Sequence, residues 1–227
     1  MSEPDQLSEL VLQEIPGKFF ERLWGRQARL YDEAREQSRE TDLWTTVESD
    51  TVWPISRRAA MEHEARLAAK EAGLKHFDEQ HAGGYPYGVV RSAKLALTFH
   101  HESGPNVVVR KCVSRVQNSG VNKFLDHFVM QEMLVQPLPD LNNTQLIYGC
   151  VIHGITIEKR AGKEYPNYFM RLAFPDAEFN GYTKNFDIGE LLQRYALIRA
   201  KHEHPEEEHE DLAVPVLNPK KKKDVIG

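Results

Sequence analysis

The chain has 227 residues, of which 41% are hydrophobic, 28% are charged and 9% are aromatic, and its formal net charge is −5. This length is enough to bury a sizeable core, and the apolar and aromatic content argues against a wholly disordered chain. No apolar run is long enough to cross a bilayer, and the N-terminus is acidic and polar rather than a leader, so we expect a soluble protein with no membrane partner.

The charge is distributed unevenly along the chain. Residues 1–85 carry a net charge of −6, residues 86–175 carry +4, and residues 176–227 carry −3. The middle of the chain is therefore its only basic part. Such asymmetry bears on partners rather than on fold.

The N-terminal part is predicted to be helical. A short helix is expected over Leu7–Glu14, where Pro16 and Gly17 stop it. A second helix is expected over Phe19–Arg39, because its apolar residues recur at three- and four-residue steps with Gln27 completing the stripe.

Two further elements are expected before residue 73. The segment Leu43–Ile55 holds tryptophans on either side of a Glu-Ser-Asp turn, which favours a short hairpin that Pro54 limits to a sheet edge. Ser56 then offers an N-cap to a charged helix over Arg57–Ala72, and Gly73 closes it.

The central part is predicted to be rich in strands. Apolar and polar residues alternate from residue 92 to residue 100, as expected of a half-buried strand. A turn over residues 102–106 then favours a hairpin with a strand over Val107–Val116. A helix is expected over Val121–Val135, where apolar residues return to helical spacing.

A similar order follows in the next segment, with strands at 146–159 and 167–174 and a helix from Asp187 to Lys201. We therefore predict an α+β fold in which a helical N-terminal part (1–82) precedes a mainly antiparallel, four-stranded sheet in ββα-ββα order (83–202). One sheet face is expected to be buried and the other polar. The charged residues 203–227 are expected to form a disordered tail.

Basic residues on the two predicted hairpins suggest a cationic surface for nucleic acid. The candidate phosphate contacts are Lys94, Arg110, Lys111, Lys159, Arg160 and Lys163. Tyr148, Tyr165 and Tyr168 could stack on bases. His100 is expected on the same side of the first hairpin as Lys94. Either Arg110 or Lys111 joins them there, depending on the strand register, which the sequence does not fix. The alternative is an ordinary solvated sheet face.

Motifs of phosphate-loop, dinucleotide, zinc-protease and serine-hydrolase chemistry are absent from the sequence. A non-enzymatic interaction protein is therefore preferred, with no cofactor and no metal expected. A metal-dependent phosphodiesterase or nuclease stays an alternative, with carboxylates from Glu158, Asp176 and Glu178. A further alternative is a homo-oligomer or a structural subunit of a larger assembly, in which Phe20, Trp24 and the hairpin tryptophans supply contacts.

Cysteine content and the C-terminus bear on location. Cys112 and Cys150 form at most one bridge, and a reducing compartment fits them better than a disulfide scaffold. We expect a cytoplasmic protein, or a nuclear one if the source is eukaryotic or viral, because PKKKKDV at Pro219–Val225 resembles lysine-run import signals.

Overall fold

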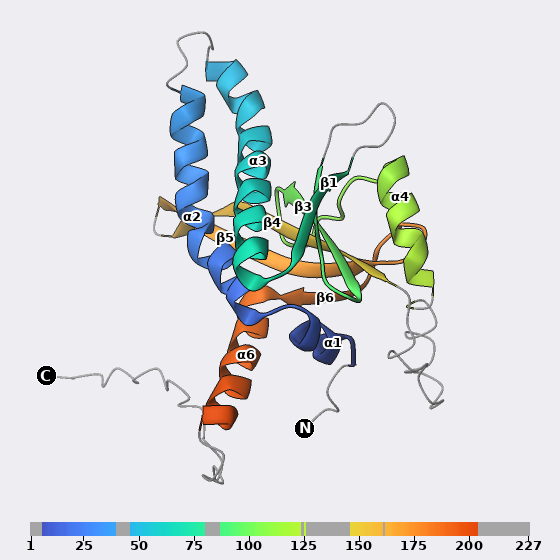
Figure 1. Ribbon diagram of the computed structural model, residues 1–227. Helices are drawn as coiled ribbons and strands as arrows, with labels where there is room; N and C mark the ends of the chain where they lie inside the picture. The colour runs from blue at the N-terminus through green and yellow to red at the C-terminus, as the bar shows by residue number, and fades with distance from the viewer. Residues whose placement is uncertain are drawn as a thin grey trace, which may run out of the picture.

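The computed structural model describes residues 6–39, 46–79, 87–123, 125, 146–160 and 162–203, and it has an α+β fold (Figure 1). The helices are α1 (Gln6–Glu14), α2 (Gly17–Arg39), α3 (Thr46–Ala72), α4 (Val113–Ser119), the 3₁₀ turn η1 (Gly120–Asn122) and α6 (Ile188–Glu203). The strands are β1 (Lys75–Glu79), β2 (Tyr87–Arg91), β3 (Leu95–Glu102), β4 (Ile147–Arg160), β5 (Lys163–Pro175) and β6 (Tyr182–Asp187).

The described strands form one mixed, six-stranded sheet in the order of the sequence, β1-β2-β3-β4-β5-β6. All neighbours are antiparallel except the central pair, in which β3 runs parallel to β4 from Leu95↔Ile147 to Glu102↔Gly154. The sheet thus consists of two three-stranded meanders joined side by side. The prediction of four strands missed β1, β2 and β6, which are short and lack a clear alternation of apolar residues.

One face of the sheet is covered by helices. The apolar stripe of α2, the inner side of α3 and residues of α1 and α6 pack with the sheet into one large core cluster. Most of the predicted stripe of α2 is buried, including its polar member Gln27, but Trp24, which was expected in the stripe, is exposed. The helices predicted at Leu7–Glu14, Phe19–Arg39 and Asp187–Lys201 are present within a few residues of their predicted ends, whereas the helix predicted at Arg57–Ala72 begins earlier, at Thr46.

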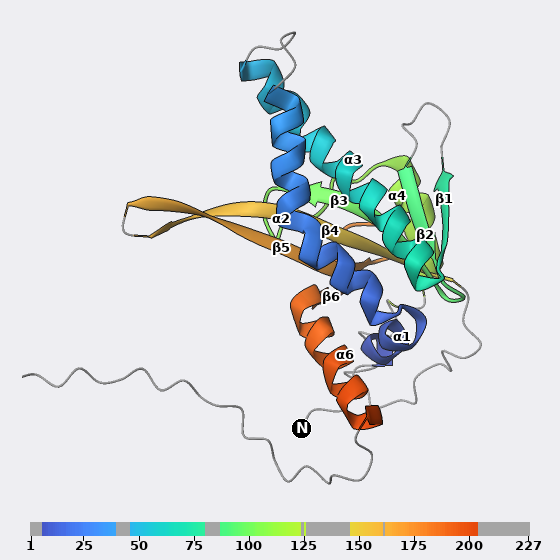
Figure 2. The ribbon, with the colours of Figure 1, turned by 60° about the vertical axis from the view of Figure 1, so that its left-hand side comes forward.

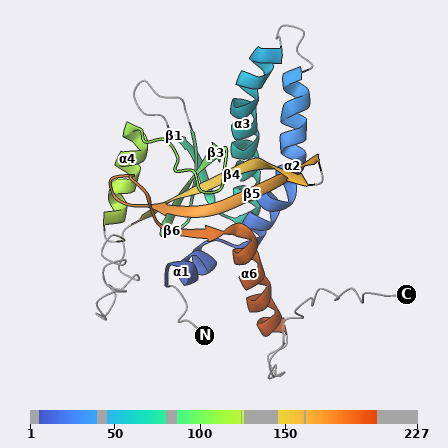
Figure 3. The same cartoon turned by 180° about the vertical axis from the view of Figure 1, so that it is seen from behind.

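The opposite face is also covered, so the prediction of a polar face is wrong. Tyr148, Cys150, Ile152, Phe169 and Ala173 on this face form a second buried cluster with side chains from the surrounding loops. Figure 3 shows α4 on this side of the fold, away from the α2–α3 pair. As a result β3 is buried from Leu95 to His100 on both faces rather than half-buried.

The predicted strand at Val107–Val116 is not formed. Residues 103–112 are irregular, and α4 begins at Val113. Side chains satisfy part of this backbone instead of a strand partner, since Arg171 donates to the Val107 carbonyl at 2.9 Å and the Val109 amide donates to the Tyr182 hydroxyl at 2.9 Å. The neighbours of β3 are β2 and β4, both distant in sequence from this segment.

The predicted hairpin at Leu43–Ile55 is also wrong over its described part, because α3 begins at Thr46 and includes Pro54. A helix places Trp53 and Arg57 one turn apart on the same face, where the guanidinium lies 4.0 Å from the centre of the indole ring. Arg35 of α2 lies 5.1 Å from the same ring. Contacts with the neighbouring helix therefore outweigh the local strand preference.

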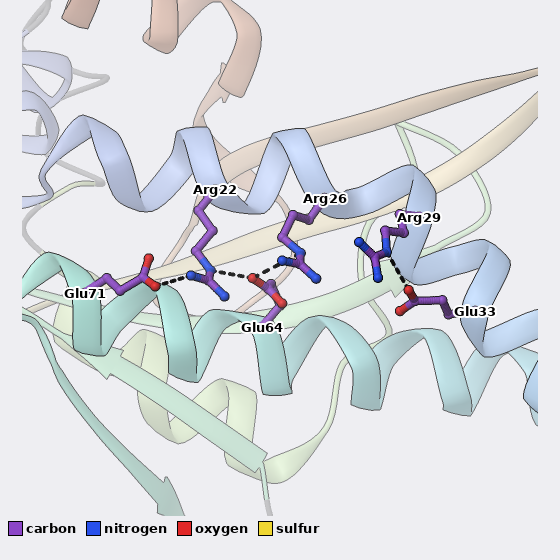
Figure 4. A network of polar contacts seen from close by, with 6 residues as sticks. All are labelled: Arg22, Arg26, Arg29, Glu33, Glu64 and Glu71. Atoms are coloured by element: carbon purple, nitrogen blue, oxygen red, sulfur yellow. Dashed lines mark hydrogen bonds and ion pairs between the residues drawn. The ribbon is translucent and has the colours of Figure 1, made fainter.

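A network of ion pairs joins α2 to α3 (Figure 4). Glu64 of α3 is only 2% exposed, and it pairs with Arg22 and with Arg26, the latter at 3.6 Å. Arg22 also pairs with Glu71, which is 61% exposed. The two helices are thus fixed in register by a buried carboxylate that is shared between two guanidinium groups.

Some predictions fall outside the described residues. These are the junction at residues 82 and 83, most of the helix at Val121–Val135, and residues 204–227 of the predicted tail. Where that helix was expected to begin, residues 120–122 form the 3₁₀ turn η1. The division into domains stays a prediction, although the main core includes side chains from both the N-terminal helices and the sheet.

Candidate functional site

Two projections of the fold border a hollow. The first is the α2–α3 helix pair, and the second is the distal part of β4 and β5, which extends away from the sheet as a two-stranded ribbon (Figure 2). The ribbon begins where β3 ends, at Glu102↔Gly154, and β6 pairs with β5 only from Arg171 onward. We call residues 155–160 and 163–169 the β-arm, and the hollow beside it the arm pocket.

The arm pocket has a volume of about 620 Å³. Its apolar side belongs to the β-arm and consists of Ile155, Ile157, Pro166 and Tyr168. These residues share one face because Ile155 is paired with Tyr168, and Ile157 with Pro166, across the ribbon. The polar and aromatic side is formed by α2, α3 and the end of β3, and it includes Tyr31, Arg35, Trp53, Arg57 and His101.

Arg57 is the most unusual side chain of the pocket. It is only 6% exposed, and its guanidinium lies 4.0 Å from the Trp53 ring centre and 5.3 Å from the Tyr31 ring centre. Within the described part of the chain it makes no ion pair, and its Nε has no hydrogen-bond acceptor. Burial lowers the pKa of this guanidinium. The neighbouring Arg58, by contrast, pairs with Glu62 at 2.9 Å.

Other polar atoms around Arg57 are also buried without a hydrogen-bond partner among the described residues. They are Nε1 of Trp53 and Nε2 of His101, both of which line the pocket, and Nε2 of His153 beneath it. Arg57 Nε and Trp53 Nε1 are N–H donors with no acceptor function. Buried donors are almost always paired, so these two N–H groups lack the acceptor that such groups normally have.

A cluster of aromatic and imidazole rings lies under Arg57. Tyr31 Oη is 2.5 Å from His153 Nδ1, and the His101 and His153 ring centres are 5.8 Å apart. Burial lowers the pKa of His101 to about 4, with a smaller contribution from Arg57, and it lowers the pKa of His153 well below its ordinary value. Burial raises the pKa of Tyr31. At neutral pH these groups are therefore uncharged, and the positive charge at the base of the pocket is that of Arg57.

The six predicted phosphate contacts lie in three places. Lys159, Arg160 and Lys163 are together at the end of the β-arm, where Lys159 pairs with Glu164 at 3.3 Å and Arg160 pairs with Glu158 at 2.5 Å. A fully extended strand rises about 3.3 Å per residue. The end of the arm is therefore roughly 40 Å from the start of β4, which is paired with the start of β3 beside Lys94.

The other basic candidates lie elsewhere. Lys94 is beside α1, where its backbone amide donates to Glu14 at 3.0 Å. Arg110 and Lys111 precede α4, and Lys111 donates to Asn180 at 2.9 Å. The expected companion His100 is buried on the face opposite the helices and contacts Thr98 at 2.8 Å, so its placement on a basic surface is wrong.

The candidate stacking tyrosines also separate. Tyr148 is buried in the second cluster, which excludes it from stacking on a bound base. Tyr168 lines the arm pocket, while Tyr165 lies on the other face of the β-arm and is exposed. Only the last two are therefore accessible.

The carboxylates considered for metal-dependent hydrolysis lie at the two ends of β5. Glu158 is on the β-arm, where it accepts hydrogen bonds from Arg160 and Asn167. Asp176 follows the other end of β5, and its Oδ1 accepts from the backbone amides of Glu178 and Asn180. In the described part of the chain, no group of three His, Cys, Asp or Glu side chains is arranged to hold a metal ion.

Sequence reasoning missed the arm pocket because its parts come from separate elements. A signal does exist in the four-residue step from Trp53 to Arg57, which places a guanidinium over an indole if the segment is helical. The absence of a carboxylate partner for Arg57 depends on tertiary packing and has no sequence signature.

Comparison with known proteins gives no relative: no protein family, no curated protein and no solved structure matches this chain. None of the described helices is long and apolar enough to cross a membrane.

Proposed function

We propose that the protein is an interaction protein that binds an anionic partner in the arm pocket, with Arg57 as the principal contact. The observation that carries this proposal is the isolation of Arg57, which is buried, charged and without a carboxylate in the described chain. A bound anion would supply an ion-pair partner for Arg57 and an acceptor for its Nε.

An unpaired buried charge lowers the stability of the folded protein. Removing a charged group from water costs several kcal/mol in proteins, and a cation–π contact returns only about 0.5–2 kcal/mol. A position that costs stability without a compensating contact is typical of a functional site. The aromatic rings of Trp53 and Tyr31 hold the guanidinium in place and thereby prepare it for a ligand.

A thermal-shift screen tests this proposal. The purified protein is heated with aryl carboxylates, phosphate monoesters and mononucleotides at millimolar concentrations, because a ligand that binds only the native state raises Tm. We expect at least one class to raise the Tm of the wild type and to have no effect on Arg57→Met. The control is Arg66→Met, which removes an exposed guanidinium from the same helix. If no anion gives a shift that depends on Arg57, the proposal is wrong.

Nucleic acid binding is a second candidate function, and its support comes from the β-arm. Lys159, Arg160 and Lys163 are gathered at the end of a projecting two-stranded ribbon, close to the exposed ring of Tyr165. A two-stranded ribbon fits the major groove of a duplex, and an exposed tyrosine can stack on a base. The pairing of two of these cations with Glu158 and Glu164 reduces the local charge.

Salt dependence tests this second candidate. Anisotropy of labelled single-stranded and duplex 20-mers is measured at 50 and 200 mM salt, because each phosphate contact makes the affinity fall with salt. We expect alanine at Lys159, Arg160 and Lys163 to weaken binding and to reduce the salt slope. Alanine at Arg110 and Lys111, the matched control, should change little. Equal effects of the two variants would argue against the β-arm as the binding surface.

Two other functions stay predictions. The metal-dependent phosphodiesterase has no observation in its favour, since its candidate carboxylates lie at opposite ends of β5. Of the contacts expected for a homo-oligomer or structural subunit, Trp24 is exposed, whereas Phe20 is buried in the main core and does not supply one. Light scattering after size-exclusion chromatography would measure the oligomeric state.

A further inference from the structure

We infer that the arm pocket takes an amphipathic monocarboxylate, that is, a small molecule with one carboxylate on an aryl or alkyl body. This inference rests on the proposed function, because it names the chemical class of the anion that Arg57 binds. It is carried by three features of the pocket: its unpaired donors, its apolar wall and its balance of charge.

The unpaired donors suit a carboxylate. Arg57 Nε and Trp53 Nε1 are both buried without an acceptor, and the Arg57 guanidinium lies over the Trp53 ring, so the two groups are adjacent. A carboxylate offers two acceptor oxygens on one flat group, and guanidinium is the side chain best matched to it. Charge-assisted hydrogen bonds of this kind are roughly twice as strong as neutral ones.

The apolar wall requires more than a small inorganic ion. Ile155, Ile157, Pro166 and Tyr168 face the polar side, and Ile157 is 55% exposed although it lines the pocket. A ligand body placed against this wall would bury that surface, which contributes about 25 cal/mol for each Å² removed from water. The volume of about 620 Å³ is within the range of organic-ligand sites.

The balance of charge favours one negative charge over two. Arg35 and Arg57 bring two positive charges to the pocket, and Asp32 and Glu164 bring two negative charges to its lining. Because Asp32 and Glu164 line the pocket, the second negative charge of a phosphate monoester would lie close to these carboxylates, where like charges repel. The same repulsion acts against a nucleic acid backbone in this pocket.

The test compares ligands that differ in one feature at a time. Calorimetric titration uses phenylacetate, 3-phenylpropionate, 4-phenylbutyrate and octanoate as probes. The controls are 3-phenylpropanamide, which lacks the charge, acetate, which lacks the body, and phenyl phosphate, which adds a charge. We expect at least one probe carboxylate to bind tenfold or more tightly than all three controls.

Two variants test separately the polar side of the pocket, at Arg57, and its apolar wall, at Ile157. Arg57→Met should weaken the best carboxylate at least tenfold, and Arg66→Met should leave its affinity unchanged. Ile157→Asn, on the exposed β-arm, should lower the affinity for the phenyl-substituted acids and for octanoate and leave the affinity for acetate unchanged. Circular dichroism and thermal melting of each variant confirm that it is folded.

The outcomes separate this inference from the proposed function. Tighter binding of phenyl phosphate than of every carboxylate, with dependence on Arg57, would overturn the inference and leave the proposed function standing. Equal binding of the amide and the acid would overturn the inference as well. If no anion binds through Arg57, both fail.

Discussion

Gln27 of α2 donates its side-chain amide to the backbone carbonyl of Gly154 in β4, with Nε2 and O 3.0 Å apart. The same amide group donates to the Phe169 carbonyl at 3.0 Å. Gly154 and Phe169 are paired across β4 and β5 at the base of the β-arm. One buried side chain therefore attaches the long helix to the point where the arm leaves the sheet.

The close packing at Gly154 predicts a large effect of adding a methyl group. A Cβ at this position would lie 2.2 Å from the Glu102 carbonyl oxygen and 2.3 Å from the Phe169 ring. We expect Gly154→Ala to lower the free energy of unfolding by about 1–3 kcal/mol or more, since overpacking forces backbone shifts. Urea denaturation gives the value.

The matched control is Gly25→Ala in α2, where a Cβ would meet nothing within 4 Å. Alanine is the better helix former, so this variant should gain about 0.5–1 kcal/mol. Loss of stability in both variants would show that the described packing at Gly154 is not the cause.

The unpaired charge of Arg57 predicts that its removal does not destabilise the protein. Arg57→Met keeps the apolar stem and removes a buried guanidinium that has no counter-ion in the described chain. We expect its Tm, without ligand, to equal or exceed that of the wild type, because replacing a buried charge by an apolar group is often neutral or stabilising. A marked fall in Tm would mean that Arg57 has a structural role, and the case for a ligand would weaken.

Burial of imidazole side chains, among them those of His101 and His153, predicts that stability falls in mild acid. The pKa of His101 is lowered to about 4 and that of His153 is lower than its ordinary value, whereas both are near 6.5 in the unfolded chain. Between these values the unfolded state binds more protons, so the free energy of unfolding decreases as pH falls from about 6.5 towards 4. Each histidine contributes up to about 1.4 kcal/mol per pH unit.

This pH dependence is measured by urea denaturation from pH 7.5 to pH 4.5. We expect His153→Gln to show a smaller slope than the wild type, whatever its stability at pH 7.5. His63→Gln, which changes an exposed histidine of α3, should keep the wild-type slope. An unchanged slope in His153→Gln would rule out this histidine as a source.

The network between α2 and α3 predicts unequal effects for its two glutamates. Glu64 is buried and pairs with two arginines, while Glu71 is exposed and pairs with one of them. Glu64→Gln should lower the urea midpoint clearly, because it leaves guanidinium groups beside a buried neutral amide. Glu71→Gln should shift it little, since exposed ion pairs contribute little. Equal shifts would contradict a special role for burial.

Local periodicity predicted the elements whose pattern is strong. The stripe of α2, with Gln27 as its polar member, was readable because its residues other than Trp24 pack into the same core. The long strands β4 and β5 were readable as well. The helix over residues 46–55 was not predicted from the sequence. Trp53 and Pro54 locally favour the edge of a sheet, while packing with Arg35 and Arg57 stabilises a helix.

The candidate site was less predictable than the fold. The basic residues are visible in the sequence, but which of them lie together depends on the sheet order and on the parallel pairing of β3 with β4. Parallel pairing has no turn to reveal it in the sequence. Arg57 lacks an ion-pair partner in the described chain because of the residues that pack around it in the folded protein. The residues next to it in the sequence do not reveal this.

The parallel pair at the middle of the sheet has a consequence for the order of assembly. Each three-stranded meander is built from neighbours in sequence, but the contact between β3 and β4 joins positions about fifty residues apart. Such a contact is slow to form, because the entropy of closing the intervening chain is lost before the contact is gained. At the base of the arm pocket, His101 of β3 is paired with His153 of β4. This region is thus expected to be among the last parts of the molecule to reach its native structure. The arm pocket would then bind its ligand only after the rest of the protein has folded.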